Sequence, residues 1–385
     1  MISMSTWRLP LPLALLASAL LLTAVSRAGK QTSSSPHAMR AVLASSFGLP
    51  QQVLYLADDV VIPNSDGRKV LIRTEACSLS PGDWRMLSGD ARSLKYPDGG
   101  FPYIPGLDVC GKVVKGAPPF TEGESVVATW GGAFGTGGLA DYSLVEPTMA
   151  VRKPEGIGCI EGAALANSAP HALSALRAAS VKPGERLLVL GGSGGVGTAM
   201  LQIARAVEFN VSYLAATSSD TTLLLSLGVD RAIDYSKENW WELQEYQEQP
   251  FDVIIDCAQG VSAWRRASSK PSILKRDGRF LAVVLNEWHI TAKSLWDIPG
   301  ILLPPLGRTL WSLVSSHFGS PRYIMYLGAL DGHILEEVMA LAAKGSLRAV
   351  LDPSSPLPFT DKGAVSAFDL LRSRHAKGKI VVNVQ

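Results

Sequence analysis

One run of residues carries the clearest architectural signal in this chain: Leu187-Leu188-Val189-Leu190-Gly191-Gly192-Ser193-Gly194-Gly195-Val196-Gly197. The run begins as a short apolar strand, turns through glycines and leads into Thr198–Ala206, where apolar residues recur at helical spacing. Glycines allow the backbone of such a turn to approach a diphosphate, and the following helix offers free N–H groups and a positive dipole end. The spacing Gly192-x-Gly194-x-x-Gly197 therefore fits a dinucleotide-binding fingerprint.

The neighbourhood of this turn distinguishes a binding loop from an ordinary surface turn, because Gly-rich turns alone are common. A second strand-like run, Val211–Thr217, follows the helix at the distance that a βαβ unit requires. Strand-like and helical stretches go on alternating, and the expected strands are Arg186–Leu190, Val211–Ala216, Ala232–Tyr235, Phe251–Cys257 and Arg279–Val284. Such alternation predicts a doubly wound parallel sheet.

The chain before this region has a different pattern, since residues 39–150 consist of short strand-like runs separated by turn residues. The runs are Val53–Val61, Lys69–Glu75, Lys112–Val114 and Ser125–Thr129. This pattern predicts a β-rich, barrel-like domain. We also expect helices over 160–180, 330–344 and 364–372 and a last strand over 379–384, whereas residues 285–325 are rich in Trp, Leu and Pro without a clear period.

The composition is that of a soluble globular protein. The 385 residues are 47% hydrophobic and 18% charged, and the chain is long enough for two domains with their own cores. A net charge of +2 without a basic stripe argues against nucleic acid as a partner. The four cysteines form no CxxC or Cys/His cluster, so neither a structural zinc lobe nor a disulfide framework is supported. Cys110 and Cys257 lie in apolar runs, where we expect buried free thiols.

The first 38 residues belong to a different class of segment. Residues 9–25 are apolar and almost uncharged, and no Asp or Glu occurs before Asp58. This pattern fits a secretory signal with cleavage after Ala28, an uncleaved anchor that contacts a membrane, or a transit peptide. We therefore expect residues 1–38 to direct the chain to an organelle or endomembrane (mitochondrion, plastid or endoplasmic reticulum) and to lie outside the folded core.

Several short motifs follow one another in an order that is characteristic of one family. They are Met39-Arg40-Ala41-Val42, Ser80-Pro81-Gly82-Asp83-Trp84, Pro105-Gly106-Leu107-Asp108-Val109-Cys110-Gly111, Gly138-Leu139-Ala140-Asp141-Tyr142 and, at the tail, His375-Ala376-Lys377-Gly378-Lys379. With these motifs, residues 39–385 resemble the medium-chain dehydrogenase/reductase superfamily, in its quinone-oxidoreductase-like branch. The tail and the Trp-rich segment are most similar to the reticulon-interacting mitochondrial proteins of that superfamily.

The resemblance implies an α/β fold with two interleaved domains. A GroES-like β-barrel catalytic domain, residues 39–165 and 316–385, is split around a Rossmann doubly wound domain, residues 166–315, and the protein is expected to form a homodimer. Zinc-dependent relatives place a Cys where this chain has Ser80 and a His-Glu pair where it has Leu107-Asp108. A leucine cannot ligate zinc and a lone serine hydroxyl is a poor ligand, so no metal is expected.

The function implied is hydride transfer from a nicotinamide cofactor to a quinone or an α,β-unsaturated carbonyl compound, without zinc. Relatives carry an Asn at Ser80 and a Thr in the segment 169–172, where this chain has His171. We predict that Ser80 and His171 lie beside the nicotinamide and that His171 delivers a proton. A packed, merely hydrogen-bonded His171 is the alternative, and Asp83 is expected either to brace the Ser80 loop or to form a turn.

NADPH is favoured over NADH as the cofactor, because the second strand ends in neutral hydroxyls rather than an acid that would grip the ribose 2′-OH. Asp220 comes slightly late, and Ser219 or Asp220 could instead cap the helix 221–227. The predicted cofactor contacts are Gly192, Ser193, Gly194, Gly195, Val196, Gly197, Thr217, Ser218, Tyr235, Cys257, Val283 and Arg374.

Two other functions remain open on the sequence. A membrane-tethered scaffold that binds nucleotide with little catalysis would be consistent with the apolar N-terminus, the altered Ser80 and His171, and the Trp-rich segment, which could also be a lid or a dimer contact. An enoyl-thioester reductase would need a longer acyl tunnel, which sequence cannot reveal.

Overall fold

The computed structural model describes residues 38–385 apart from residues 95, 98, 130–136, 207, 286–290 and 329–330. Residues 1–37, which hold nearly all of the predicted targeting segment and the membrane contact predicted for residues 9–25, lie outside the described residues. Among the helices of the described part, none combines the length and the apolar character that a bilayer crossing requires.

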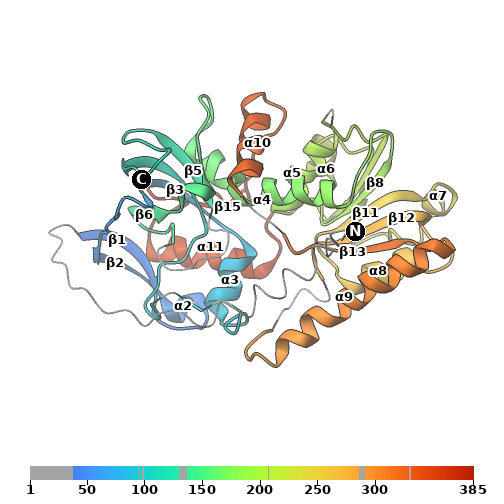
Figure 1. Ribbon diagram of the computed structural model, residues 1–385, viewed down its shortest axis with the longest axis horizontal. Coiled ribbons are helices and arrows are strands. Elements are labelled where there is room, and N and C mark those ends of the chain that lie inside the picture. Colours follow the sequence, from blue (N-terminus) through green and yellow to red (C-terminus); the bar gives the residue numbers. More distant parts are fainter. Residues whose placement is uncertain are drawn as a thin grey trace, which may run out of the picture. The chain divides into compact units, whose positions relative to one another are not determined.

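The first domain is built on a mixed sheet with the strand order β14-β15-β3-β4-β5-β7, in which β6 also pairs with β3. Strands β3, β5, β6 and β15 of this sheet are labelled in Figure 1. Its C-terminal strand β15 lies between β14 and β3, so the end of the chain completes the sheet that its N-terminal half begins. The strands are β1 Ala38–Ala44, β2 Leu54–Val61, β3 Val70–Leu79, β4 Asp108–Lys115, β5 Ser125–Thr129, β6 Tyr142–Val145, β7 Ala150–Arg152, β14 Leu357–Pro358 and β15 Ile380–Asn383. Its helices are α2 Pro50–Val53, α3 Pro81–Ser88 and α11 Asp361–Ser373, with a 3-10 turn at Pro147–Met149.

The second domain is a six-stranded parallel sheet with the order β10-β9-β8-β11-β12-β13. Its strands are β8 Arg186–Leu190, β9 Tyr213–Ser218, β10 Arg231–Asp234, β11 Phe251–Asp256, β12 Leu274–Ala282 and β13 Arg322–Met325. The helices of this half are α5 Gly195–Ala204, α6 Thr221–Ser226, α7 Gln244–Glu248, α8 Val261–Ser268, α9 Asp297–Ser315 and α10 Gly332–Ala343, with a 3-10 turn at Ser316–Phe318. The expected doubly wound sheet is confirmed, and the order reverses at β8, directly before the glycine turn.

The position of β13 differs from the expected domain boundary. This strand pairs in parallel with β12, so the Rossmann sheet extends beyond residue 315, where we expected the GroES-like part to resume. The sequence signal was lost because the long segment between β12 and β13 has no strand-like alternation.

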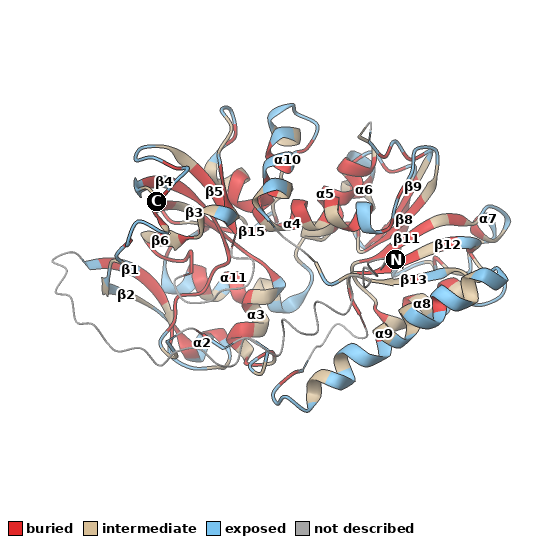
Figure 2. Cartoon of the chain, in the orientation of Figure 1, coloured by how far each residue is buried: buried red, intermediate tan, exposed pale blue. Residues whose placement is uncertain are grey.

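Helix α4, Cys159–Ala178, joins the two sheets. It contacts β3, β4, β5 and β15 on one side and α5 on the other, and its buried residues belong to a core shared by both domains (Figure 2). Alanines dominate its buried face, and they both favour the helix and allow close approach. A Cβ at Gly162 would lie 2.8 Å from Val127 Cγ2, which shows how near the helix comes to β5.

The prediction that Cys110 is a free thiol is wrong. Cys110 on β4 and Cys159 at the start of α4 form a disulfide, with their Cα atoms 5.1 Å apart. The packing of α4 against β4 brings the two residues together although 49 positions separate them in the sequence. Cys257 remains a free thiol, as expected, and so does the buried Cys77.

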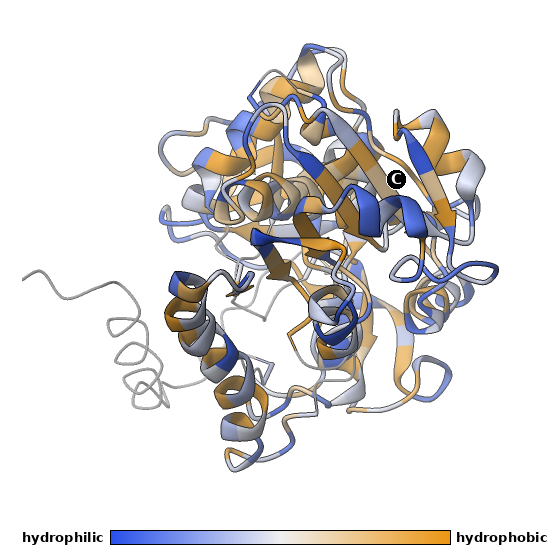
Figure 3. Cartoon of the chain, turned by 90° about the vertical axis from the view of Figure 1, so that its right-hand side faces the viewer, coloured by the Kyte–Doolittle hydropathy of each residue, from blue (hydrophilic) through white to orange (hydrophobic). Residues whose placement is uncertain are grey.

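The segment without a clear period contains the long helix α9. Of its residues, only Pro305 and Ser312 are buried, while Trp311 and Leu303 are 72% and 61% exposed. Several apolar residues of this helix are therefore exposed, and Figure 3 colours the chain by residue hydropathy. The Arg308 side chain donates to Leu285 O at 2.9 Å and lies over the Tyr323 ring. Pro304 and Pro305 lie inside the helix, and such residues argue against a helix when only the sequence is read.

Candidate active site

The glycine turn joins β8 to α5 in the way that the fingerprint predicts. Gly191 has a φ of +84°, its N–H donates to Thr217 Oγ1 at 3.0 Å, and Gly192 N donates to Thr217 O at 2.9 Å. A Cβ at Gly197 would lie 2.3 Å from Gly191 O, so only glycine fits there. The turn therefore delivers the unpaired N–H groups of the first turn of α5 to one spot, which suits a diphosphate.

The C-terminal tail closes against this turn. Gly378 N donates to Ser193 O at 2.7 Å, and Gly378 forms a bridge with Gly194. A Cβ at Gly195 would lie 2.8 Å from Lys379 Cδ, so the aliphatic part of that lysine runs directly against the turn. The tail and the glycine turn thus form one unit although about 180 residues separate them.

Ser80 is the centre of a largely buried polar group that we call the Ser80 cluster: Ser80, Asp108, Thr129, Asn167 and Lys379. Ser80 Oγ donates to Asp108 Oδ2 at 2.8 Å, and Lys379 Nζ donates to Ser80 Oγ at 2.8 Å. The same ammonium lies 3.2 Å from Asp108 Oδ2 and 2.9 Å from Leu79 O. The relative exposure of Ser80, Asp108 and Lys379 is 6%, 0% and 6%.

The cluster extends to α4 through two further residues. Thr129 Oγ1 donates to Asp108 Oδ1 at 2.8 Å, and Asn167 Nδ2 donates to Thr129 Oγ1 at 3.3 Å. Our sequence reasoning identified Ser80 alone and missed the other members. The available signal was the tail: Lys379 opens a strand whose other residues are mostly apolar, and a buried lysine needs a partner.

Asp83 braces the Ser80 loop, which was the first of its two expected roles. Its Oδ2 accepts a hydrogen bond from Ser80 N at 2.8 Å and its Oδ1 accepts one from Gly106 N at 3.0 Å. Asp83, in the first turn of α3, thereby ties the backbone of the Ser80 loop to that of Gly106. Burial raises the pKa of Asp83 to about 7.

His171 lies on α4, one turn beyond Asn167. Its Nδ1 is 3.1 Å from Tyr326 Oη, and the tyrosine hydroxyl is also 3.3 Å from His171 O. A Cβ at Gly328 would lie 2.7 Å from His171 Cε1, so the ring packs against the residues that follow β13. The structure therefore ties His171 to the Tyr326 segment, whereas it ties Ser80 to Asp108 and Lys379.

At the end of β9, Asp220 has the capping role that was the alternative to a cofactor contact. Its Oδ1 accepts from Leu223 N at 3.0 Å and its Oδ2 pairs with Lys377 Nζ at 2.8 Å. The hydrogen bond from Lys377 lowers the pKa of Asp220. Ser218 is buried and its Oγ accepts from Asp220 N at 2.9 Å, while the side chain of Thr217 supports Gly191. Both predicted hydroxyls therefore hold backbone groups of the site.

The remaining predicted contacts lie at strand and helix ends. Cys257 and Val283 follow β11 and β12, are partly buried, and donate their N–H groups to Leu190 O and Asp256 O at 3.0 Å each. Tyr235 follows β10 and is half exposed. Arg374 ends α11 with a φ of 62°; its charge adds to burial in lowering the pKa of Arg85 on α3.

The positions that bind zinc in relatives do not suit a metal here. Leu107 offers no donor atom, and the Lys379 ammonium lies within hydrogen-bonding distance of both Ser80 Oγ and Asp108 Oδ2. The Lys379 ammonium therefore already places a positive charge beside these two oxygens. Across the residues that the structure describes, no three His, Cys, Asp or Glu side chains gather as a metal-binding group.

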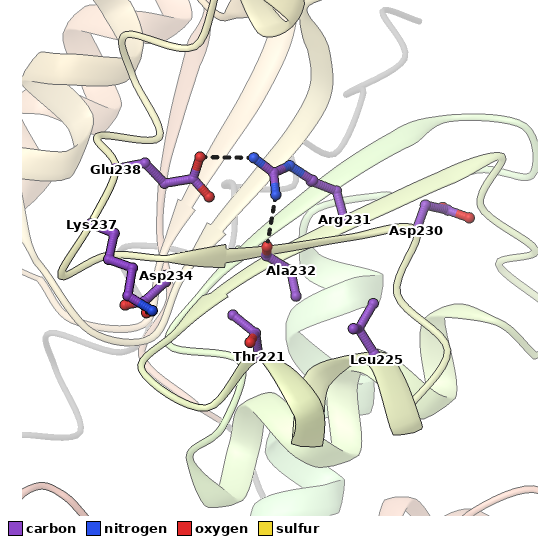
Figure 4. Close-up of a pocket in the computed structure, with 8 residues that line it drawn as sticks. All are labelled: Thr221, Leu225, Asp230, Arg231, Ala232, Asp234, Lys237 and Glu238. Atoms are coloured by element: carbon purple, nitrogen blue, oxygen red, sulfur yellow. Dashed lines mark hydrogen bonds and ion pairs between the residues drawn. The ribbon is translucent and has the colours of Figure 1, made fainter.

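A pocket of about 410 Å³ lies elsewhere, on the edge strand β10 and helix α6 (Figure 4). Its lining residues are Thr221, Leu225, Asp230, Arg231, Ala232, Asp234, Lys237 and Glu238. The charged groups pair within the wall: Arg231 with Glu238 at 2.8 Å and Lys237 with Asp234 at 2.9 Å. None of the predicted site residues lines this pocket, so we place the candidate site at the glycine turn and the Ser80 cluster.

Two family models match the chain. One, described as zinc-binding dehydrogenase, covers residues 227–382, and the other, described as alcohol dehydrogenase GroES-like domain, covers residues 66–155. The chain is 32% identical over 370 residues to 2-methylene-furan-3-one reductase of Solanum lycopersicum, covering 92% of this chain and 82% of that protein. It is 30% identical over 359 residues to the chloroplastic NADPH-dependent alkenal/one oxidoreductase of Arabidopsis thaliana, covering 91% and 80%.

Solved structures agree with this grouping. The quinone oxidoreductase of Coxiella burnetii superposes with a TM-score of 0.73 at 24% identity, over 91% of this chain and all of that one. The quinone oxidoreductase of Thermus thermophilus, whose structure was also solved in complex with NADPH, gives a TM-score of 0.64 at 25% identity, over 90% of this chain and all of that one.

Proposed function

Because the chain belongs to the medium-chain dehydrogenase/reductase superfamily, we propose that it is an NADPH-dependent reductase of quinones or α,β-unsaturated carbonyl compounds. The names of its relatives support the reaction and the cofactor, since they include alkenal/one and furanone reductases and quinone oxidoreductases. The observation that carries the proposal is the joining of the glycine turn to the Ser80 cluster through Gly378 and Lys379. Through these contacts, the Ser80 cluster is held at a fixed position relative to the proposed diphosphate site.

Different residues of the chain are proposed to bind different parts of the cofactor. The turn Gly192–Gly197 receives the diphosphate, because it has no side chains in the way and opens a helix. Ser218, Tyr235 and Lys377 lie toward the 2′-phosphate end, where Lys377 provides a cation beside Asp220. When bound, NADPH supplies a hydride from its nicotinamide ring. Ser80 and His171 are then the groups proposed to lie beside that ring.

Proton delivery is assigned to His171. As hydride reaches the acceptor, negative charge develops on the substrate oxygen, and a nearby donor stabilises that charge more in the transition state than in the bound ground state. An imidazole changes its charge near neutral pH, so it can hold and release this proton. Its contact with Tyr326 fixes the ring from the side of β13. A conjugated acceptor is already polarised, so the reaction needs no Lewis acid.

Purified full-length chain tests the proposal by NADPH oxidation in the presence of quinones, enones and enoyl thioesters, with Gly195→Asp as the binding-deficient control. We expect turnover of quinones or enones by wild type, preference for NADPH over NADH, and activity that survives chelator dialysis. Reduction of enoyl thioesters alone would favour the thioester reductase. NADPH binding without any turnover would favour the scaffold function. Equal affinities for NADH and NADPH would refute the assignment of the 2′-phosphate end.

We propose an organelle as the place of action, since three of the relatives are named chloroplastic or chloroplast-envelope proteins. Residues 1–38 would direct the chain to that organelle. Microscopy of a tagged full-length chain distinguishes among mitochondrion, plastid and endoplasmic reticulum. We also propose a homodimer, which analytical ultracentrifugation tests, and the closer likeness to reticulon-interacting proteins remains a prediction.

A further inference from the structure

The Ser80 cluster holds an ion pair that stability alone does not explain. Asp108 is fully buried and Lys379 nearly so, and their charged atoms are 3.2 Å apart. Removing two charges from water costs free energy that their attraction offsets only in part, so apolar residues of similar size would often be as stable. A buried pair of this kind, placed against a binding turn, therefore calls for another role.

Counting hydrogen bonds shows what the pair does to Ser80. A serine hydroxyl has one hydrogen and two lone pairs. Ser80 Oγ gives its hydrogen to Asp108 Oδ2, and one lone pair accepts from the Lys379 ammonium. One lone pair remains, so the hydroxyl can accept a further hydrogen bond but has no hydrogen left to donate.

Lys379 is held in this arrangement by all three of its ammonium hydrogens. They are directed to Leu79 O at 2.9 Å, Ser80 Oγ at 2.8 Å and Asp108 Oδ2 at 3.2 Å. The ammonium is thus satisfied within the protein and is not required at the diphosphate. Its carbon chain packs against Gly195, and the preceding Gly378 N–H bonds Ser193 O. One side chain therefore touches both the diphosphate turn and the Ser80 loop.

We propose that Lys379 is a positioning residue, which fixes the Ser80 hydroxyl as a hydrogen-bond acceptor at a set distance from the diphosphate turn. The proposal rests on the proposed function, because the donor that Ser80 accepts from would be a hydroxyl or amide of the nicotinamide riboside half of the cofactor. Asp108 completes the device by holding the Ser80 hydrogen away from that donor. Ser80 is thus not the source of the proton in the reaction.

The test uses five full-length variants: Lys379→Met, Asp108→Asn, the double variant with both changes, Ser80→Ala, and the triple variant that combines all three changes. Each single change at the ion pair leaves one buried charge without a partner, so both proteins should melt well below wild type. The double variant contains neither charge and should recover most of the lost melting temperature. NADPH affinity is measured by fluorescence titration and turnover with a quinone, both at low temperature where every variant is folded.

Turnover of the double variant shows whether Lys379 positions the Ser80 hydroxyl or only stabilises the fold. We expect its kcat to stay roughly tenfold to a hundredfold below wild type, while its Kd for NADPH changes by less than about threefold. Ser80→Ala should lose a similar factor, and adding it to the double variant should cost little more, because the double variant has already lost the positioning of the hydroxyl that Ser80→Ala removes. Wild-type turnover in the double variant, or losses that multiply, would show that Lys379 only supports the fold.

The emission of bound NADPH tests this inference without requiring turnover, so that its failure can be told apart from failure of the proposed function. If wild type binds NADPH but reduces no acceptor, the proposed function fails, and the emission spectrum of bound NADPH then decides the inference. The double variant and Ser80→Ala should share one altered emission, because both change the surroundings of the nicotinamide. A wild-type spectrum in either variant overturns the inference.

Discussion

The two ends of the candidate site are built in opposite ways. At the Ser80 cluster, the side chains of Ser80, Asp108 and Lys379 are buried and bonded within the protein, and the two charges face each other away from water. At the end of β9, Asp220 and Lys377 also pair, but their side chains are 25% and 42% exposed. The same chemistry, an aspartate with a lysine, is thus used once in the interior and once near the surface.

This difference indicates that two aspartate–lysine pairs in one site can have different roles. A buried pair is costly to break and rigid, which suits a group whose position must be kept. An exposed pair contributes little stability and is screened by salt, so its residues are free to be used in recognising a charged ligand. We expect changes at the buried end to affect folding and rate, and changes at the exposed end to affect the choice of cofactor.

The largest effect is expected at the turn that lies between the two ends. In Gly197→Ala, the added methyl would lie 2.3 Å from Gly191 O, and backbone cannot yield there. We expect loss of NADPH binding together with a strongly lowered melting temperature, measured by calorimetry. Gly194→Ala is the matched control, because the nearest atom to its added methyl is 3.6 Å away; it should melt like wild type. Equal melting of both variants would contradict this account of the turn.

Next in size is the effect of His171→Ala on rate. If His171 delivers the proton, kcat should fall by roughly a hundredfold or more, with the Kd for NADPH little changed. The rate of wild type should depend on pH, and the variant should lose that part of the dependence. His375→Ala, in the exposed tail, is the control and should turn over normally. A His171 variant with normal turnover and earlier melting would make this residue a packing residue.

The buried end also predicts how stability depends on pH. Burial raises the pKa of Asp83 to about 7, above that of an aspartate in the unfolded chain. The folded protein therefore holds this proton more tightly, and the stability contributed is fully present below about pH 4 and is lost as the pH rises through about 7. Denaturation in urea at pH 5 and pH 8 should show a larger loss for wild type than for Asp83→Asn, by a few kcal/mol at most. Equal losses would mean that Asp83 stays ionised throughout.

A smaller effect is expected from the Thr129 hydroxyl of the cluster. Thr129→Val keeps the shape of the side chain but removes the bond to Asp108 Oδ1 and the weaker bond from Asn167 Nδ2, which should lower the free energy of unfolding by about 1.5–3 kcal/mol. Thr222→Val, the same change at an exposed position of α6, should stay within about 0.5 kcal/mol. Similar losses in the free energy of unfolding for the two variants would contradict the difference expected between the buried and the exposed position.

The smallest effect is expected at the exposed pair. Lys377→Gln removes a cation at the end of β9, where a 2′-phosphate is expected, so the affinity for NADPH should fall a few-fold and become less dependent on salt, while that for NADH is unchanged. Lys237→Gln, which removes another exposed cation on the β10 side, is the control. An equal fall for NADH and NADPH would show that Lys377 acts only through the cap of α6.

The sequence predicted the elements and the glycine turn because both depend on local patterns. The strand Ser125–Thr129 and the strand Arg186–Leu190 have the predicted bounds, and Asp220 caps α6 as one of its two interpretations required. Period and capping are properties of neighbouring residues, so a single sequence reveals them.

What the sequence did not reveal depends on contacts between distant residues. The members of the Ser80 cluster come from the junction of β3 and α3, from β4, β5 and α4, and from the tail before β15, and they meet only when α4 and the tail pack onto the first sheet. The Cys110–Cys159 disulfide was missed for the same reason, since no spacing motif links the two. Helix α9 was missed because Pro304 and Pro305 lie inside it, and prolines in a sequence argue against a continuous helix.

The order in which a chain is synthesised gives the tail a further significance. Gly378, Lys379 and β15 follow the other elements of both domains in the sequence, so they leave the ribosome after them. Until then β3 lacks its β15 neighbour, Asp108 lacks its cation, and Ser193 O lacks its donor. The cofactor site is therefore completed only when both domains have been synthesised.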